Sequence, residues 1–130
     1  MELLQPEGWA PPKGFANGVA ASGRLVCVAG QVGWDPATAT FATDDFVAQA
    51  RQALANVVAV VAAAGGGPQH IVRMTWFVTD KRAYQAAAKD LGTAYRGVMG
   101  RHFPAMTLVE VKSLLEPRAQ VEIEATAVVP

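Results

Sequence analysis

Two segments of the chain repeat their apolar residues every three or four positions, a pattern typical of amphipathic helices. The first begins after Thr43-Asp44-Asp45, where an oxygen-bearing side chain can cap a helix, and ends before Gly65-Gly66-Gly67-Pro68. The second runs from about Lys81 to Met99 and ends at Gly100. The predicted inner side of the first helix consists of Phe46, Ala50, Ala53, Leu54, Val57, Val58 and Val61. That of the second consists of Tyr84, Ala87, Ala88, Leu91, Tyr95, Val98 and Met99.

Strands are predicted where β-branched and aromatic residues gather, or where apolar and polar residues alternate. Ile71 to Val78 is the clearest of them. Phe15 to Ala29 indicates two short strands joined at Ser22-Gly23, a dipeptide suited to a hairpin turn. His102 to Glu110 passes through a proline into an apolar strand, and Val121 to Val129 alternates. We expect these last two strands to pair as antiparallel neighbours.

The order of elements, ββ, α, β, α, ββ, predicts a two-layer α+β domain with both helices on one face of a mixed sheet. Residues 1–130 fit a single domain, and residues 1–14 form an extended lead-in because three prolines interrupt any helix there. The second face of the sheet is left uncovered. It would carry Met106, Leu108 and Glu110 from one strand and Glu122, Glu124, Thr126 and Val128 from its neighbour. Such a face is better explained by packing against other subunits than by solvent.

The composition of the chain indicates how it associates and which partners it excludes. Hydrophobic residues make up 52% of the chain and charged residues 17%, against roughly a quarter charged in a typical soluble domain, which favours association into an oligomer. Eleven basic and eleven acidic residues cancel, so no basic excess attracts nucleic acid. The single cysteine, Cys27, cannot form an internal disulfide and is expected to be small and buried in a strand. With no apolar stretch judged long enough to span a bilayer, we expect a cytoplasmic protein without membrane contact.

Several side chains are candidates for a catalytic or ligand-binding role. Glu122 and Glu124 share one face of the last strand, and unpaired buried charge is costly enough to need a reason. Glu122 could serve in a site or could be a structural carboxylate, and Glu124 is the weaker choice. Trp34, which follows the Gly30–Gly33 loop, could stack on a planar ligand, and His102 could act as an acid or base. No metal-ligand spacing, phosphate loop or hydrolase nucleophile motif is present.

Six segments occur in a specific order: Gly18-Val19, Val28–Pro36 (VAGQVGWDP), Asp45–Gly65, Ile71–Asp80 (IVRMTWFVTD), Phe103–Thr107 (FPAMT) and Val121–Val128 (VEIEATAV). Together they resemble the RidA/YjgF family of reactive-intermediate deaminases, whose members are also labelled endoribonuclease L-PSP. The resemblance covers nearly the whole chain from Phe15 onward. It implies a chorismate-mutase-like fold and a homotrimer whose three sheets form a central barrel. It also implies a small-molecule ligand in each of the three clefts between subunits.

The resemblance implies a reaction and its residues as well. Enzymes of this family hydrolyse enamines and imines to a carbonyl compound and ammonia, with no metal or organic cofactor. A glutamate on the last strand positions the attacking water, and by position it is Glu122. The residues that match the lining of the cleft are Phe15, Ala29 and Gly30.

The chain departs from the family pattern where an arginine normally pairs with the substrate carboxylate. Met106 stands there, and an uncharged thioether cannot anchor a carboxylate. Phe15 likewise stands where a tyrosine is common. Another cation could replace the missing arginine, and the possible replacements are Arg73, Arg101, Lys112 and Arg118.

Two functions of different classes follow. The first is a hydrolytic deaminase of a reactive enamine or imine, with specificity altered by Met106. The second is a non-catalytic trimer that binds a small apolar metabolite in the inter-subunit cleft. A ribonuclease is disfavoured because the net charge is zero and no basic groove is evident.

Overall fold

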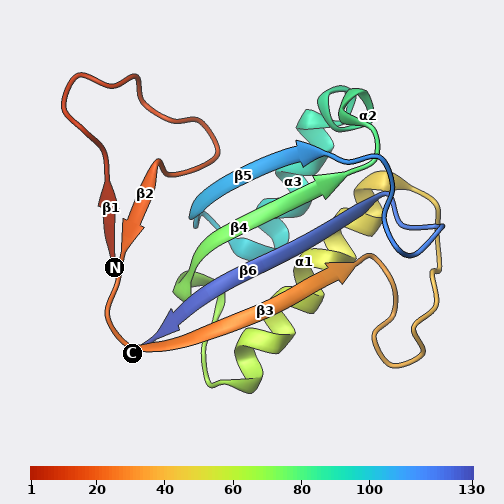
Figure 1. The fold of residues 1–130 in the computed structure, drawn as a ribbon, viewed down its shortest axis with the longest axis horizontal. Coiled ribbons are helices and arrows are strands. Elements are labelled where there is room, and N and C mark those ends of the chain that lie inside the picture. The colour runs from red at the N-terminus through yellow and green to blue at the C-terminus, as the bar shows by residue number, and fades with distance from the viewer.

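Four strands form a mixed sheet, and helices cover one of its two faces (Figure 1). A computed structural model describes residues 1–130. The strands β3 (Arg24–Val32), β4 (Ile71–Val78), β5 (Ala105–Glu110) and β6 (Val121–Val129) lie in the order β3-β6-β4-β5. β6 is antiparallel to both of its neighbours, whereas β5 runs parallel to β4. The predicted two-layer α+β class is confirmed.

Helix α1 (Phe46–Ala63) forms where the apolar repeat predicted it, and the Asp45 carboxylate caps it by accepting a hydrogen bond from the Ala48 N–H at 2.9 Å. A short 3₁₀ turn, η1 (Pro68–His70), precedes β4. The segment predicted to form a single second helix forms two helices, α2 (Lys81–Ala86) and α3 (Ala88–Met99). One non-helical residue joins them. Only α3 of this pair carries buried side chains, so it is α3 that anchors the second helical region to the sheet.

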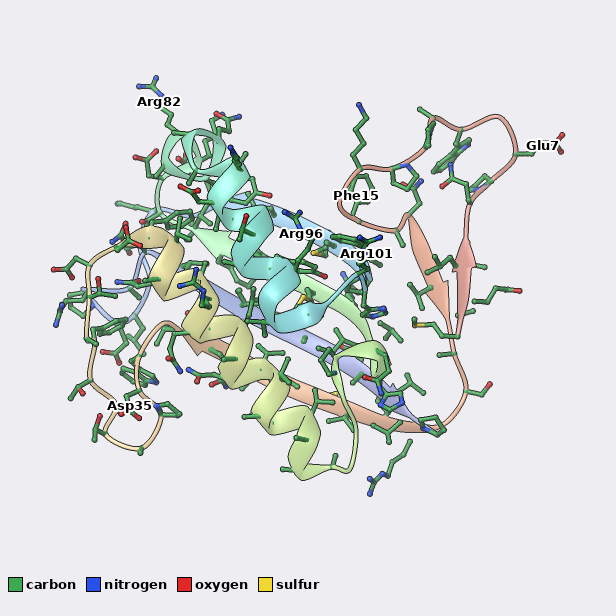
Figure 2. The ribbon with its side chains drawn as sticks, turned by 180° about the vertical axis from the view of Figure 1, so that it is seen from behind. Glu7, Phe15, Asp35, Arg82, Arg96 and Arg101 are labelled. Carbon is green, nitrogen blue, oxygen red and sulfur yellow. The ribbon has the colours of Figure 1, made fainter.

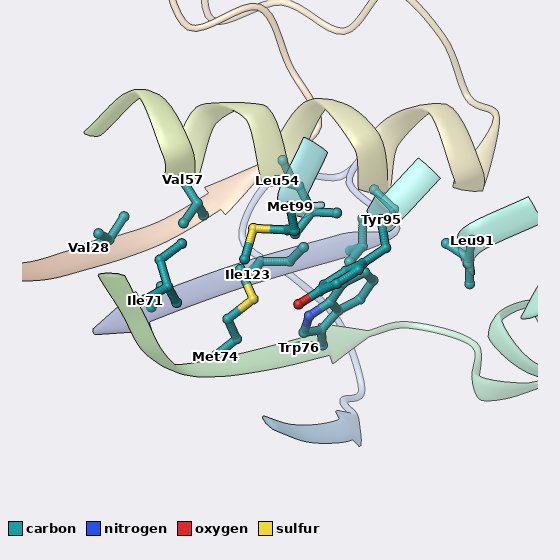
Figure 3. Close-up of a cluster of buried hydrophobic side chains, with 14 of the residues drawn as sticks. Val28, Leu54, Val57, Ile71, Met74, Trp76, Leu91, Tyr95, Met99 and Ile123 are labelled. Carbon is teal, nitrogen blue, oxygen red and sulfur yellow. The ribbon is translucent and has the colours of Figure 1, made fainter. Parts of the chain in front are cut away.

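The core lies between the sheet and these helices (Figure 3). Val121, Ile123 and Ala127 of β6 are fully buried and belong to the same apolar cluster as Leu54 of α1 and Met99 of α3. By length and composition alone α1 could cross a membrane, which contradicts the expectation that no apolar stretch is long enough. In this fold the apolar side of α1 belongs to the core instead.

The predicted antiparallel pairing of the last two strands is wrong. β6 inserts between β3 and β4, and β5 lies on the other side of β4 in parallel register, with Met106 beside Met74. Parallel neighbours need a crossover connection, and α2 with α3 supplies it between β4 and β5. The order of strand, helix and strand along the chain therefore accounts for the parallel pairing of β5 with β4.

The predicted hairpin at Ser22-Gly23 is also wrong. β2 (Gly18–Ala20) pairs with β1 (Glu2–Leu4) in a separate two-stranded sheet beside the main one (Figure 1), while β3 pairs with β6. Gly23 marks the passage from the small sheet to the large one. Its φ is +148°, and an added Cβ would lie 2.5 Å from the Val129 carbonyl oxygen, so this close approach requires glycine.

The outer face of the sheet carries apolar side chains that nothing within the chain covers. Leu25 is 65% exposed and Val109 40% exposed. Cys27 is exposed rather than buried as expected, because Val26 and Val28 on either side of it take the positions that face the helices. This face is therefore available for packing against another molecule.

Replacing Gly97 with alanine is expected to stabilise the protein. Gly97 is an exposed interior residue of α3, and nothing lies within 4 Å of an added Cβ. Removing glycine from a helix interior should raise the free energy of unfolding by about 0.5–1 kcal/mol, measured by urea denaturation. Gly92→Ala is the matched comparison, and its gain should be smaller because the new Cβ would meet Nη1 of Arg96 at 3.1 Å. A loss of stability in Gly97→Ala would contradict a regular helix at this position.

Candidate functional site

A cavity of about 530 Å³ opens between α3, the sheet and the segment that precedes β2. Phe15 and Met106 both line it. The Ala16 N–H donates a hydrogen bond to the Pro104 carbonyl oxygen at 2.9 Å, which holds the Phe15 segment beside the start of β5. The aromatic part of the wall consists of Phe15, Trp76, Tyr84, Tyr95 and Phe103. The structure thus brings together two of the predicted substrate-binding residues.

Hydrogen bonds fix the back of this cavity. The Tyr95 hydroxyl donates to the His102 carbonyl oxygen at 2.5 Å, and His102 Nε2 donates to the Ile71 carbonyl oxygen at 2.6 Å. The Phe103 ring stacks on Tyr95 with ring centroids 5.2 Å apart. Burial raises the pKa of the Tyr95 hydroxyl above its ordinary value, so the hydroxyl keeps its proton and remains a donor. His102 therefore ties the loop before β5 to the start of β4, which is a structural role.

Met106 points to the helix side of the sheet. It packs against the core, beside the fully buried Met74. Glu122 points to the opposite side, because its neighbours Val121 and Ile123 are both buried under the helices. The expectation that Met106 and Glu122 share one face is therefore wrong. It followed from the incorrect antiparallel pairing of β5 with β6.

Glu122 packs directly against Gly30. The register between β3 and β6 shifts between Val28 and Gln31, which places Ala29 and Gly30 in a bulge beside the carboxylate. An added Cβ at Gly30 would lie 2.0 Å from Oε2 of Glu122, so a larger residue there would displace the carboxylate from its position. The single ion pair in the chain joins Arg118 to Asp44, and Glu122 therefore has no cation as its partner. The carboxylate is half-buried on the outer face of the sheet.

The remaining sequence candidates lie apart from the cavity. Trp34 packs against Phe41, with ring centroids 5.7 Å apart, and its carbonyl oxygen accepts a hydrogen bond from Asn56 Nδ2 at 3.0 Å. Glu124 is exposed on the same face as Glu122. No three His, Cys, Asp or Glu side chains come together in a way that could hold a metal ion.

None of the four proposed replacement cations lines the cavity with Met106. Arg118 is engaged by Asp44 at 3.0 Å and lies over the Phe41 ring, and Arg73 and Lys112 are exposed elsewhere. Arg101 lines a neighbouring cavity of about 730 Å³ under the β1–β2 segment, which shares Gly14, Phe15 and Phe103 with the first.

The sequence reasoning missed Arg96, an exposed residue of α3 that does line the cavity with Met106. Figure 2 shows it extending from α3 on the side of Phe15. A signal for it was present, because Ala88, Gly92 and Arg96 recur at four-residue steps and form one stripe of α3 along the cavity. The two small residues leave space along the helix, and the arginine reaches back into that space.

Residues 8–129 match the family model described as Endoribonuclease L-PSP. The chain belongs to this family. It is 39% identical over 109 residues to the 2-iminobutanoate/2-iminopropanoate deaminase of Salmonella typhimurium, covering 82% of this chain and 80% of that relative. It is 37% identical over 108 residues to protein DfrA of Myxococcus xanthus, covering 82% and 78%. The expected membership of the RidA/YjgF family is confirmed.

Solved structures of the family share the fold. YyfB from Yersinia pestis, described as a protein of unknown function of the conserved Rid protein family, matches with a TM-score of 0.85 and 31% identity over 98% of both chains. The YjgF gene product of Escherichia coli matches with a TM-score of 0.70 and 34% identity, covering 89% of this chain and 88% of that one. The fold described above is therefore that of Rid proteins.

Proposed function

We propose that this chain is a hydrolytic deaminase that converts reactive enamines or imines to a carbonyl compound and ammonia. The observation that carries the proposal is the unpaired Glu122 carboxylate packed against the backbone of Gly30. A carboxylate in this setting can hold a water molecule and take a proton from it. Two relatives, 39% and 37% identical, are named 2-iminobutanoate/2-iminopropanoate deaminase, which supports the same reaction type here.

In the proposed reaction, Glu122 orients a water and accepts one of its protons as the water oxygen bonds to the imine carbon. The electron pair of the C=N double bond moves to nitrogen, which takes up a proton. The nitrogen of the carbinolamine then takes up a second proton, the one that Glu122 accepted from the water. The hydroxyl proton passes back to the Glu122 carboxylate, the C–N bond breaks, and ammonia leaves as the carbonyl forms. An enamine enters the same route after tautomerising to its imine. One water is consumed for each ammonia released.

A substrate cannot touch Met106 and Glu122 of the same chain, because the two side chains lie on opposite faces of one sheet. We therefore place each site between two subunits of a homotrimer. Phe15 and Met106 would come from one subunit, and Gly30 and Glu122 from the next. The exposed apolar side chains on the outer face of the sheet support this assembly, since a central barrel would cover them.

A second function is favoured by one specific observation. Met106 removes the charge that would hold a small imino acid by its carboxylate, and the lining that remains is largely apolar. A non-catalytic trimer that binds an apolar metabolite in the same cleft is consistent with this lining.

The two functions are separated by measuring ammonia release from freshly generated imines, above the uncatalysed rate. The substrates are 2-iminopropanoate and an imine with a larger apolar side chain. Release that increases in proportion to protein concentration supports the deaminase. If the folded, trimeric protein accelerates neither hydrolysis, the deaminase is excluded and the binding function is favoured.

Met106→Arg is expected to raise kcat/KM for 2-iminopropanoate at least about tenfold. A guanidinium on the edge strand β5 would supply a charge-assisted, bidentate partner for the substrate carboxylate. Met106→Leu is the control for loss of the thioether without gain of charge, and its activity should match that of the wild type. Equal kcat/KM for the arginine and leucine variants would show that position 106 does not contact the carboxylate.

A further inference from the structure

The cavity beside Met106 has the charge pattern of a site for an anion. Its lining contains two cations, Lys13 and Arg96, and no acidic residue, and nine of its fourteen lining residues are hydrophobic. Arg96 has no ion-pair partner in the chain. Its guanidinium lies along α3 over Gly92, where an added Cβ would come within 3.1 Å of Nη1. A positive group at the edge of an apolar cavity favours a ligand with one negative end and one apolar end.

The wall away from the cations is aromatic. Trp76 is 5% exposed and meets Tyr84 edge to face, with ring centroids 6.2 Å apart. Its indole N–H is the one buried side-chain polar group in the chain without a hydrogen-bond partner. This N–H is buried within the wall, so a ligand ring in the cavity would contact the aromatic faces of the wall rather than this donor.

The volume indicates the size of the apolar end. Small-molecule sites typically enclose about 300–1,000 Å³, and this cavity has about 530 Å³. A ligand whose side chain is one methyl group, such as 2-iminopropanoate, would leave most of this space unfilled. An aromatic side chain would fill much more of it and bury its ring among Phe15, Tyr84 and Phe103.

We propose that this cavity binds aromatic carboxylates, with the ring between Phe15 and Trp76 and the carboxylate on Arg96, so that the substrates are 2-imino acids with aromatic side chains. This inference rests on the deaminase proposed above for its reaction, but the binding site itself does not depend on catalysis. Arg96 takes the role that Met106 cannot perform, from a helix rather than from a strand.

Binding of 3-phenylpropanoate to the full-length protein tests the site without any reaction. Its binding should change the indole emission, because Trp76 lines the cavity whereas Trp9 and Trp34 do not, and calorimetry gives the affinity independently. Arg96→Gln should weaken binding about tenfold or more. Arg96→Lys should recover part of the loss, since it keeps the charge but not the bidentate geometry. Arg82→Gln, which removes an exposed arginine of α2 distant from Phe15 (Figure 2), should leave the affinity unchanged.

Two further ligands separate the contributions of the ring and the carboxylate. The alcohol 3-phenylpropan-1-ol keeps the ring without the charge, so it should bind more weakly and respond little to Arg96→Gln. Propanoate keeps the charge without the ring and should bind more weakly than 3-phenylpropanoate. No saturable binding of 3-phenylpropanoate, or equal binding to the wild type and Arg96→Gln, would overturn the proposal.

The failure of this site and the failure of the deaminase give different results. Selective, Arg96-dependent binding in a protein that hydrolyses no imine would keep the aromatic carboxylate site and exclude the deaminase. Glu122-dependent hydrolysis of 2-iminopropanoate that is faster than that of 2-imino-3-phenylpropanoate, with no effect of Arg96→Gln, would keep the deaminase and overturn this inference. If both proposals hold, Arg96→Gln raises KM for the aromatic imino acid and changes kcat little.

Discussion

Replacing Glu122 with glutamine is expected to lower kcat for imine hydrolysis by about two to four orders of magnitude, the usual contribution of a positioned general base. Glutamine keeps the size and shape of the side chain, so it should still fit beside Gly30. It loses the negative charge and the oxygen basicity that allow the carboxylate to take a proton from water. The measurement is steady-state ammonia release from an imine that the wild type hydrolyses.

Glu124→Gln is the matched control for this prediction. Glu124 lies two residues further along β6, on the same outer face, and it is exposed. Its replacement changes the net charge by the same amount, yet we expect kcat within about twofold of the wild type, since exposed charges contribute little. Both variants should unfold at the wild-type temperature. If Glu122→Gln kept full activity, Glu122 would be a structural residue and the proposed reaction would need another base.

Gln49→Leu is expected to lower the free energy of unfolding by about 3 kcal/mol, the largest effect on stability that we anticipate. Gln49 is fully buried in α1. Its Nε2 donates to the carbonyl oxygens of Thr43 and Arg118, both at 3.1 Å, and its Oε1 accepts from the Gln120 N–H at 2.9 Å. Leucine fills a similar volume but leaves these three backbone groups without their partner. Thermal unfolding should show a loss on the order of 10 °C in Tm.

Gln85→Leu is the control for Gln49→Leu. Gln85 is exposed on α2, and we expect its replacement to change the free energy of unfolding by less than about 0.5 kcal/mol. A comparably small effect of Gln49→Leu would mean that water satisfies the three backbone groups once the amide is gone. That result would contradict the structural role assigned here to Gln49.

The polar residues inside α1 show a limit of sequence reasoning. The apolar repeat identified the helix and most of its buried side, but it passed over Gln49 and Asn56, which are both buried. Asn56 donates to the carbonyl oxygens of Val32 and Trp34, as Gln49 does to two others. All of these partners except Thr43 are more than twenty residues away in sequence. The local sequence pattern therefore does not distinguish a buried amide side chain from an exposed one. The difference arises only when the tertiary structure brings the loops that it binds next to the helix.

In the candidate site, too, the features that depend on neighbouring residues were predicted correctly, and those that depend on distant segments were not. Alternation along β6 predicted correctly that Glu122 points away from Val121 and Ile123, because side-chain direction within one strand is a local property. The side of the sheet to which Met106 points was predicted incorrectly, because it depends on which strand β5 joins and in which direction. The order of a strand, a helix and a strand from Ile71 to Glu110 was the signal for parallel pairing.

The sequence by itself determined the family, the positions of the main helices and strands, a helix cap within Thr43-Asp44-Asp45 and the orientation of Glu122 within its strand. Each of these depends on residues close together along the chain or on the order of motifs. Only the tertiary structure decided that β6 separates β3 from β4, that Met106 and Glu122 lie on opposite faces, and that Arg96 enters the cavity beside Met106. These features depend on pairing and packing between distant segments, which the local periodicity of a sequence does not specify.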